Sequence, residues 1–242
     1  MALHFLVEDS GSASTGDIVS LTGAEAKHAA VVRRLRVGES VTIGDGTGIW
    51  LDGEVTDVSA SRVDVRIAGR AAIEAPAKRL VLVQALAKGD RDELAVQAAC
   101  ELGVDEVVPW QASRSISRWE GAKAVKGRER WTAIVREASK QAHRAWVPEV
   151  SAPLSTGQLI AHADGQRMLV LDPTATLRLS AVEPDDRDLM LIVGPEGGIA
   201  PDELEKFEAA GAERVRLGDT VLRTSTAGPA AIAVLSATLG RW

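Results

Sequence analysis

The sequence predicts an α/β protein in which helices cover both faces of a mostly parallel sheet, and a smaller β-rich domain comes first. Three observations predict this. Short strand-like stretches separated by turn residues fill the first 73 residues. After residue 80, continuous apolar runs alternate with helical stretches, as in parallel sheets buried on both faces. Small residues and a proline lie between these two parts of the chain, as in a linker. We therefore expect a domain at 1–73, a linker at 74–79 and a second domain at 80–242.

Four strands are expected in the first domain, because their residues are β-branched and either alternate with polar residues or form apolar runs. They cover residues 18–21, 40–43, 50–55 and 62–67. The segment Asp45-Gly46-Thr47-Gly48 predicts a hairpin turn. Its glycine spacing is also found in nucleotide-binding loops, but no helix follows, so a turn is favoured. Short strands separated by turn residues in this way indicate a small β-barrel.

A helix over residues 24–36 interrupts these strands. Thr22 and Glu25 have the spacing of a capping box, which predicts where the helix begins. The end of this helix is strongly basic, with Arg33, Arg34 and Arg36. Cations at this position complement a helix dipole. Three arginines in four positions exceed that need, so contact with RNA phosphates is the favoured interpretation.

The second domain is expected to alternate strands with helices. The predicted strands are 80–86, 104–109, 167–171, 189–193 and 215–217, and the predicted helices are 90–102, 129–142, 201–210 and 227–239. Gly103 and Gly211 follow two of the helices, at the position where a left-handed residue commonly ends a helix.

The segment Gly194-Pro195-Glu196-Gly197-Gly198 follows a buried strand and precedes a helix that opens at Pro201. Ligands of α/β proteins bind at the carboxyl ends of strands, and glycines let the backbone approach a ligand closely. The segment matches neither the dinucleotide motif nor the P-loop. A neutral, adenosine-like ligand held by main-chain groups is therefore favoured over a purely structural turn.

A second unusual loop contains Arg223-Thr224-Ser225-Thr226-Ala227. Thr224 or Thr226 is expected to cap the following helix. A buried arginine at this place needs a partner, which Glu196 or a substrate would supply. We expect the two loops to form one site.

Further basic residues follow the strand predicted over residues 104–109 and lie along the helix predicted over residues 129–142. Ser113-Arg114-Ser115 lies at the strand end, and Arg136, Lys140 and Arg144 are spaced to share one helix face. Such a row is either a solvated face or an RNA-binding surface. A metal site is not expected, because the chain has one cysteine and four scattered histidines. Cys100 is expected to be a core thiol.

Composition excludes several classes of protein. With 45% hydrophobic and 26% charged residues the chain can bury a core. The net charge of −6 argues against a surface that is basic all over, though not against a local basic patch. No stretch approaches the ~20 apolar residues of a membrane span. A single cysteine and the absence of a signal-like N-terminus agree with a cytoplasmic location.

Taken together, these residues identify a family resemblance over essentially the whole length. The chain resembles the RsmE-type ribosomal RNA uridine-N3 methyltransferases of the SPOUT superfamily. The matches outside the two loops are His28, Arg33, Arg34, Gly38, residues 87–90, residues 101–104, Pro109, residues 113–115, Arg130, Trp131, Glu137, Ala138, Gln141, Arg144 and Pro148. The strongest matches are Gly194–Gly198, Leu217-Gly218 and Leu222–Ala227.

The resemblance implies a PUA-like barrel, a trefoil-knotted methyltransferase domain, a homodimer, S-adenosylmethionine as methyl donor and 16S ribosomal RNA as substrate. Arg223 and Glu196 are the expected catalytic residues. The expected cofactor-binding residues are Leu171, Gly194, Pro195, Glu196, Gly197, Gly198, Leu217, Gly218, Leu222, Thr224 and Thr226. The expected RNA-binding residues are His28, Arg33, Arg34, Arg36, Lys88, Arg114, Arg136, Lys140 and Arg144.

Two other functions remain open. One is ribose 2′-O-methylation by a SPOUT enzyme, whose usual second-loop signature of Ile-Pro-Met and Ser-Leu-Asn-Val is absent from this chain. The other is a non-catalytic, RNA-binding ribosome assembly factor that retains the fold.

Overall fold

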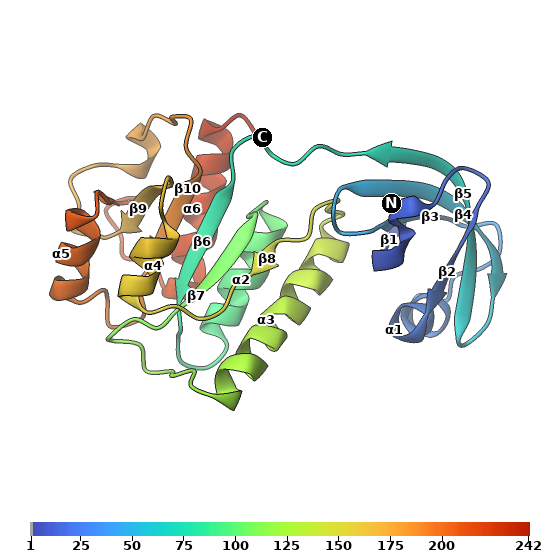
Figure 1. Ribbon diagram of the computed structural model, residues 1–242, viewed down its shortest axis with the longest axis horizontal. Coiled ribbons are helices and arrows are strands. Elements are labelled where there is room, and N and C mark those ends of the chain that lie inside the picture. Colours follow the sequence, from blue (N-terminus) through green and yellow to red (C-terminus); the bar gives the residue numbers. More distant parts are fainter. Residues whose placement is uncertain (1) are drawn as a thin grey trace. The chain divides into compact units, whose positions relative to one another are not determined.

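The structure is a computed structural model that describes residues 2–242, and it divides into two units (Figure 1). The first unit contains the chain up to Ala75 together with Ser139–Val147. The second contains Pro76–Ala138 and Pro148–Trp242. The chain therefore returns to the first unit after most of a long helix of the second.

The first unit is built on a five-stranded sheet in the order β1-β3-β4-β5-β2. Its elements are β1 (Leu3–Leu6), β2 (Ile18–Thr22), α1 (Gly23–Lys27), β3 (Ser40–Gly44), β4 (Ile49–Val58) and β5 (Arg62–Ala72), with a 3-10 turn at Glu8–Ser12. β1 pairs with β3 in parallel, and the other neighbours are antiparallel. The four predicted strands are confirmed, whereas β1 was not predicted. Phe5, Leu21, Ile43 and Leu51 lie in its core.

The predicted hairpin turn joins β3 to β4. The Asp45 carboxylate accepts hydrogen bonds from the backbone N–H groups of Thr47 (2.7 Å) and Ile49 (3.0 Å). Gly46 and Gly48 have φ values of 81° and 106°, which are unfavourable for other residues. These contacts account for the glycine spacing without a nucleotide.

The helix expected over residues 24–36 is shorter than predicted. α1 ends at Lys27, a π-helical turn covers His28–Val32, and Arg34 has a φ of 56°. Arg33, Arg34 and Arg36 therefore lie beyond the helix, all exposed. The capping box was also wrong, because the Thr22 side chain caps nothing and Glu25 accepts a hydrogen bond from Lys140 Nζ (2.9 Å). A buried ammonium group requires such a carboxylate.

The segment Ser139–Val147 packs as part of the first unit. Gly48 N donates to Ala145 O (3.0 Å), and Val147 N donates to Gly46 O (2.9 Å). Trp146 Nε1 donates to Ile73 O (2.9 Å). Nothing in the sequence pattern connected this segment with the first 75 residues.

The second unit contains a six-stranded sheet in the order β11-β9-β10-β6-β7-β8, with every neighbouring pair parallel. Its strands are β6 (Leu80–Ala85), β7 (Glu106–Trp110), β8 (Glu149–Val150), β9 (Arg167–Leu171), β10 (Leu189–Val193) and β11 (Glu213–Val215). Its helices are α2 (Arg91–Glu101), α3 (Ala122–Gln141), α4 (Thr156–His162), α5 (Pro201–Ala209) and α6 (Thr224–Thr238), with a 3-10 turn at Leu179–Ala181. β8 and α4 were not predicted.

Helices cover both faces of this sheet, as predicted (Figure 1). On one face, Val81 and Val83 of β6 share a core with Leu159 of α4 and Phe207 of α5. On the other face, β6 and β10 contact α6, which packs against α2. Alternate residues of β6 thus face opposite layers. Cys100 is buried in α2, as expected for a core thiol.

Two helix boundaries correct the sequence interpretation. α3 runs from Ala122 to Gln141, and His143 has a φ of 53°, so Arg144 follows the helix and does not continue a row with Arg136 and Lys140. Lys140 is only 8% exposed and belongs to no solvated face. α6 begins at Thr224, one turn earlier than predicted, because the backbone of Arg223 already accepts the first helical hydrogen bonds.

Candidate functional site

A cavity of about 680 Å³ lies in the second unit, at the carboxyl ends of β9, β10 and β11 and the first turn of α6. Ligand sites of parallel α/β sheets occur at this edge, and the volume is typical of a small-molecule pocket. The predicted glycine-rich loop and the loop before α6 form opposite parts of its wall. The expectation that the two loops form one site is therefore consistent with their positions.

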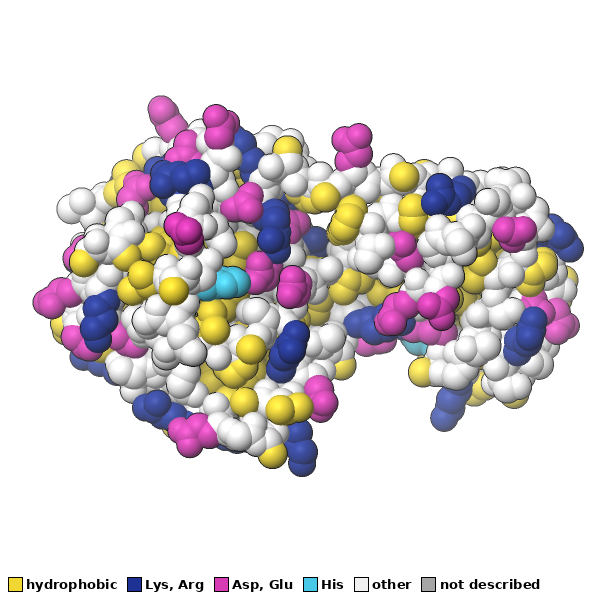
Figure 2. Space-filling view, in the orientation of Figure 1, with side chains coloured by type: hydrophobic (Ala, Val, Ile, Leu, Met, Phe, Trp, Pro, Cys, Tyr) yellow, Lys and Arg dark blue, Asp and Glu magenta, His cyan; other side chains and the backbone are white. Residues whose placement is uncertain are grey.

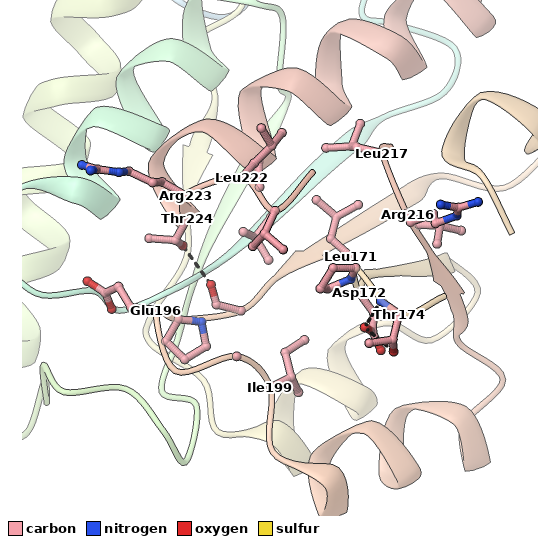
Figure 3. A pocket seen from close by; sticks show the side chains of 18 of the residues that line it. Leu171, Asp172, Thr174, Glu196, Ile199, Arg216, Leu217, Leu222, Arg223 and Thr224 are labelled. Carbon is pink, nitrogen blue, oxygen red and sulfur yellow. Dashed lines mark hydrogen bonds between the residues drawn. The ribbon is translucent and has the colours of Figure 1, made fainter. Parts of the chain in front are cut away.

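The middle of the cavity is apolar. Leu171, Ile199, Leu217 and Leu222 contribute side chains to its wall (Figure 3). Gly198 and Gly218 also line it, and a Cβ atom at either would meet nothing within 4 Å. Apolar walls beside open backbone suit a flat, weakly polar group such as an adenine ring.

Glu196 lies at one end of the cavity, and it is ionised and already engaged. Its Oε1 accepts hydrogen bonds from Arg91 Nη1 (2.8 Å) and from the Lys88 backbone N–H (3.1 Å). Burial raises the pKa of Glu196, but its own backbone N–H, Arg91 and the Lys88 N–H together lower the pKa below its usual value. A carboxylate held in this way orients neighbouring groups better than it accepts protons.

Arg223 lies at the same end as Glu196 (Figure 3). It is exposed, and its backbone is the N-cap of α6. Within residues 2–242, its guanidinium makes no hydrogen bond or ion pair. Glu196 is not its partner, because Arg91 takes that carboxylate. The sequence predicted a partner for a buried arginine. Because Arg223 is exposed, it needs no partner within the protein, and its guanidinium is accessible to a substrate.

Thr224 joins the two loops and does not cap the helix from outside it. Its Oγ1 donates to the carbonyl of Gly194 (2.8 Å), the bond drawn in Figure 3. The side chain is in the first turn of α6 and is 6% exposed. Thr226, the other predicted cap, is exposed and does not line the cavity, so its expected contact with a ligand has no geometric support.

The predicted cofactor residues therefore fall into two groups. Those lining the cavity are Leu171, Gly194, Pro195, Glu196, Gly198, Leu217, Gly218, Leu222 and Thr224. Gly197 and Thr226 lie outside its lining. The carbonyl of Gly197 instead accepts a hydrogen bond from Arg114 Nη1 (3.1 Å).

The opposite end of the cavity is a charged cluster that the sequence did not reveal (Figure 3). The Asp172 carboxylate accepts hydrogen bonds from Arg214 Nε (2.8 Å) and from Thr174 N and Oγ1 (2.8 Å each). Burial raises the pKa of Asp172, but these bonds outweigh it and lower the pKa. The position of Asp172, directly after β9, was the one available signal.

The predicted RNA-binding residues are dispersed over the chain. Arg33, Arg34 and Arg36 are exposed in the first unit, and Lys88 and Arg114 are exposed in the second. His28, Arg136 and Arg144 are half-buried, and Lys140 is buried. On the face drawn in Figure 2, acidic and basic side chains are interspersed, so no continuous basic surface appears there.

Residues 2–242 contain neither a metal-binding cluster nor a membrane-spanning helix. No group of three or more His, Cys, Asp or Glu side chains is arranged to hold a metal ion. No helix in the same range is long and apolar enough to cross a membrane.

Comparison with protein families finds two matches. Residues 74–236 match an RNA methyltransferase domain, and residues 21–68 match an RNA methyltransferase PUA domain. The chain is 42% identical over 234 residues to the ribosomal RNA small subunit methyltransferase E of Mycobacterium bovis, covering 94% of this chain and 89% of the relative. The protein of the same name from Bacillus subtilis is 31% identical over 233 residues, covering 90% and 89%.

A solved structure supports the same relationship. The chain resembles a ribosomal RNA small subunit methyltransferase E from Neisseria gonorrhoeae, which was crystallised bound to S-adenosyl methionine. The TM-score is 0.88 at 28% identity, and 98% of each chain is covered.

Proposed function

Because the chain belongs to the ribosomal RNA small subunit methyltransferase E family, we propose that it methylates N3 of a uridine in 16S ribosomal RNA. The enzyme class is an S-adenosylmethionine-dependent RNA methyltransferase. The uridine and its N3 atom are the proposed specificity. The observation that carries this proposal is the guanidinium of Arg223, exposed and unpaired within residues 2–242 at the end of the cofactor cavity.

The cavity fits the cofactor by its chemistry. Its apolar middle suits the adenine ring, and the backbone around Gly194, Gly198, Leu217 and Gly218 offers hydrogen-bonding groups. When bound, S-adenosylmethionine supplies an electrophilic methyl group on a sulfonium.

Methylation at N3 requires the loss of a proton. The N3–carbon bond would form as the methyl carbon–sulfur bond breaks and S-adenosylhomocysteine leaves, and the N3 proton would pass to Glu196 or to solvent water. Arg223 stabilises the negative charge that develops on the uracil ring, as a preorganised cation does in other active sites. Glu196 orients the base or accepts the proton, and its lowered pKa favours the orienting role. Positioning the two reactants contributes roughly 7–11 kcal/mol to lowering the barrier.

Exposed basic residues supply the expected contacts to the RNA backbone. Arg33, Arg34 and Arg36 in the first unit, and Lys88 and Arg114 in the second, are the residues we assign to phosphate groups. Lys140 is removed from this set because it is buried against Glu25.

Mass mapping of 16S ribosomal RNA is the experiment that tests the proposal. RNA from a strain lacking the protein is compared with RNA from the parent strain, and purified protein is then added back with S-adenosylmethionine. We expect one uridine to lose a base methyl group and to regain it. A methyl group on the ribose would favour a 2′-O-methyltransferase instead, and no change in methylation would favour an assembly factor.

Three accompanying expectations remain predictions: a homodimer, a cytoplasmic location and a trefoil knot in the second unit. Light scattering of the purified chain tests the first. A monomeric mass at concentrations where methylation proceeds would contradict it.

A further inference from the structure

Gln84 is a polar residue in a fully buried strand. All six residues of β6 are buried, and Gln84 is 0% exposed. Its neighbours along the strand are apolar, as expected in the centre of a parallel sheet. A glutamine here must desolvate a whole amide, so its presence calls for an explanation.

The amide of Gln84 is only half satisfied. Its Nε2 donates to Thr224 Oγ1 (2.9 Å) and to the Ala85 carbonyl (3.1 Å), whereas Oε1 has no partner. Exchanging the two amide atoms would bring Oε1 against the Ala85 carbonyl, so the neighbouring groups fix this orientation. An unsatisfied buried oxygen destabilises the fold.

The bonds that Gln84 does make end at the cofactor cavity. Thr224 accepts from Gln84 and donates to the carbonyl of Gly194, so one chain of hydrogen bonds joins β6, the first turn of α6 and the glycine-rich loop. Thr224, in the middle of this chain, and Gly194, at its far end, both line the cavity. The bond from Thr224 to Gly194 is visible in Figure 3.

Helix α6 packs closely against the sheet around Gln84. A Cβ atom on Gly228 of α6 would lie 3.1 Å from Leu82 Cδ1, 3.5 Å from Val193 Cγ2 and 3.7 Å from Gln84 Oε1. The glycine therefore lets α6 approach the sheet at the point where the hydrogen bonds cross.

We propose that Gln84 is a positioning residue for S-adenosylmethionine binding, because it fixes the spacing of the two cavity loops through Thr224 and Gly194. It touches no ligand itself. Its unpaired oxygen weakens the fold, and its amide N–H preorganises the site. The proposal concerns cofactor binding, so it stands or falls independently of the uridine N3 assignment.

Replacing Gln84 separates these two effects. In the full chain, Gln84→Met removes both the unpaired oxygen and the bond to Thr224 at similar volume. We expect the Kd for S-adenosylmethionine, measured by calorimetry, to rise about tenfold, the equivalent of one hydrogen bond. The urea midpoint of unfolding should stay unchanged or rise. A purely structural residue would show a lower midpoint with an unchanged Kd.

Ser236 provides a matched control. It lies in α6, is 0% exposed, and its Oγ also has no partner. It is not part of the cavity wall. Ser236→Ala removes a buried unsatisfied oxygen just as Gln84→Met does, so the Kd should remain that of the parent protein.

Thr224 provides a second, independent test. Thr224→Val removes the hydroxyl through which Gln84 acts, together with its bond to Gly194, and it should weaken cofactor binding at least as much as Gln84→Met does. The double variant of Gln84→Met and Thr224→Val should bind no more weakly than Thr224→Val alone. An unchanged Kd in Gln84→Met, or full additivity in the double variant, overturns the proposal. If Gln84→Met fails to fold, an unchanged Kd in Thr224→Val overturns it.

Discussion

Arg223 is the side chain whose replacement should separate chemistry from cofactor binding. Its guanidinium is exposed and makes no hydrogen bond or ion pair within the described residues 2–242, so Arg223→Ala should leave the fold intact and the Kd for S-adenosylmethionine within several-fold of the parent value. Methyl transfer should fall by about 10²–10³, the usual cost of losing a preorganised electrostatic group. A radioactive methyl-transfer assay on RNA measures the rate.

Arg223→Lys serves as the companion variant because it keeps the charge and loses the planar fork. Partial activity is expected from it. Near-normal turnover of Arg223→Ala would refute the assigned role.

His4 should make the first unit sensitive to mild acid. Its ring stacks on Trp50 with centroids 4.4 Å apart, and its Nδ1 is 2.9 Å from Thr42 Oγ1. Burial, and then the charges of His143 and Lys140, lower the pKa of His4 from 6.5 to about 4. Between these values the unfolded chain binds more protons than the folded one, so stability falls as the pH falls.

The maximum loss corresponds to about 3.5 kcal/mol, at about 1.4 kcal/mol for each pKa unit. Urea unfolding between pH 7.5 and pH 4 measures it, and His4→Gln should flatten the dependence over this window. A parent protein and a His4→Gln variant that lose stability in parallel would contradict the prediction.

The sequence identified several residues of the site, but it did not show which side chains they contact. The glycine-rich loop and Arg223 were identified because their composition is unusual for a strand end. Arg91 was missed because an arginine at the start of a helix is usually solvated. Its ion pair with Glu196 joins residues that are far apart in the sequence. Lys140 was misplaced because its helical spacing matched that of an exposed row.

Helix caps differ between the two units, and the difference is testable. Ser155 forms a capping box with Gln158 at the start of α4, whereas the Thr22 hydroxyl caps nothing at the start of α1. Ser155→Ala should therefore cost about 1 kcal/mol of unfolding free energy. Thr22→Val keeps the β-branched shape and should change stability by less than about 0.5 kcal/mol. Equal losses in urea unfolding would show that the geometry of the caps is unimportant.

Strands and helices were predictable where the apolar residues followed one clear pattern. The apolar strands β6, β9 and β10 and the helices α2 and α5 were located within a residue or two. β1 was missed because its sequence, Leu3-His4-Phe5-Leu6, contains no β-branched residue and does not alternate regularly. The extent of α3 was underestimated because its first half is largely polar and exposed, with no apolar stripe to reveal it.

The first unit includes Ser139–Val147, a segment that is distant in sequence from its other residues. Ser139–Val147 supplies backbone hydrogen bonds to the β3–β4 turn and a lysine to Glu25. A fragment of residues 2–75 should thus unfold at a lower urea concentration than the first unit does in the full chain. Breaking a buried ion pair alone costs about 3–5 kcal/mol.

Circular dichroism of two fragments measures this effect. The control carries residues 139–147 joined to the fragment by a flexible linker, and it should recover most of the lost stability. The prediction fails if the short fragment is as stable as the control. No sequence pattern could reveal this dependence, because the contacts join residues about 100 positions apart and leave no local period.

The returning segment also has a consequence during synthesis on the ribosome. Val147, the last residue of this segment, is made roughly 70 residues after Ala75. At about 5–20 residues per second, this leaves the first unit without its returning segment for roughly 4–14 s. During that interval the β3–β4 turn lacks its bridge to Trp146 and the Glu25 carboxylate lacks Lys140. Translation speed between codons 76 and 147 should therefore influence how much of the newly made enzyme reaches its native state.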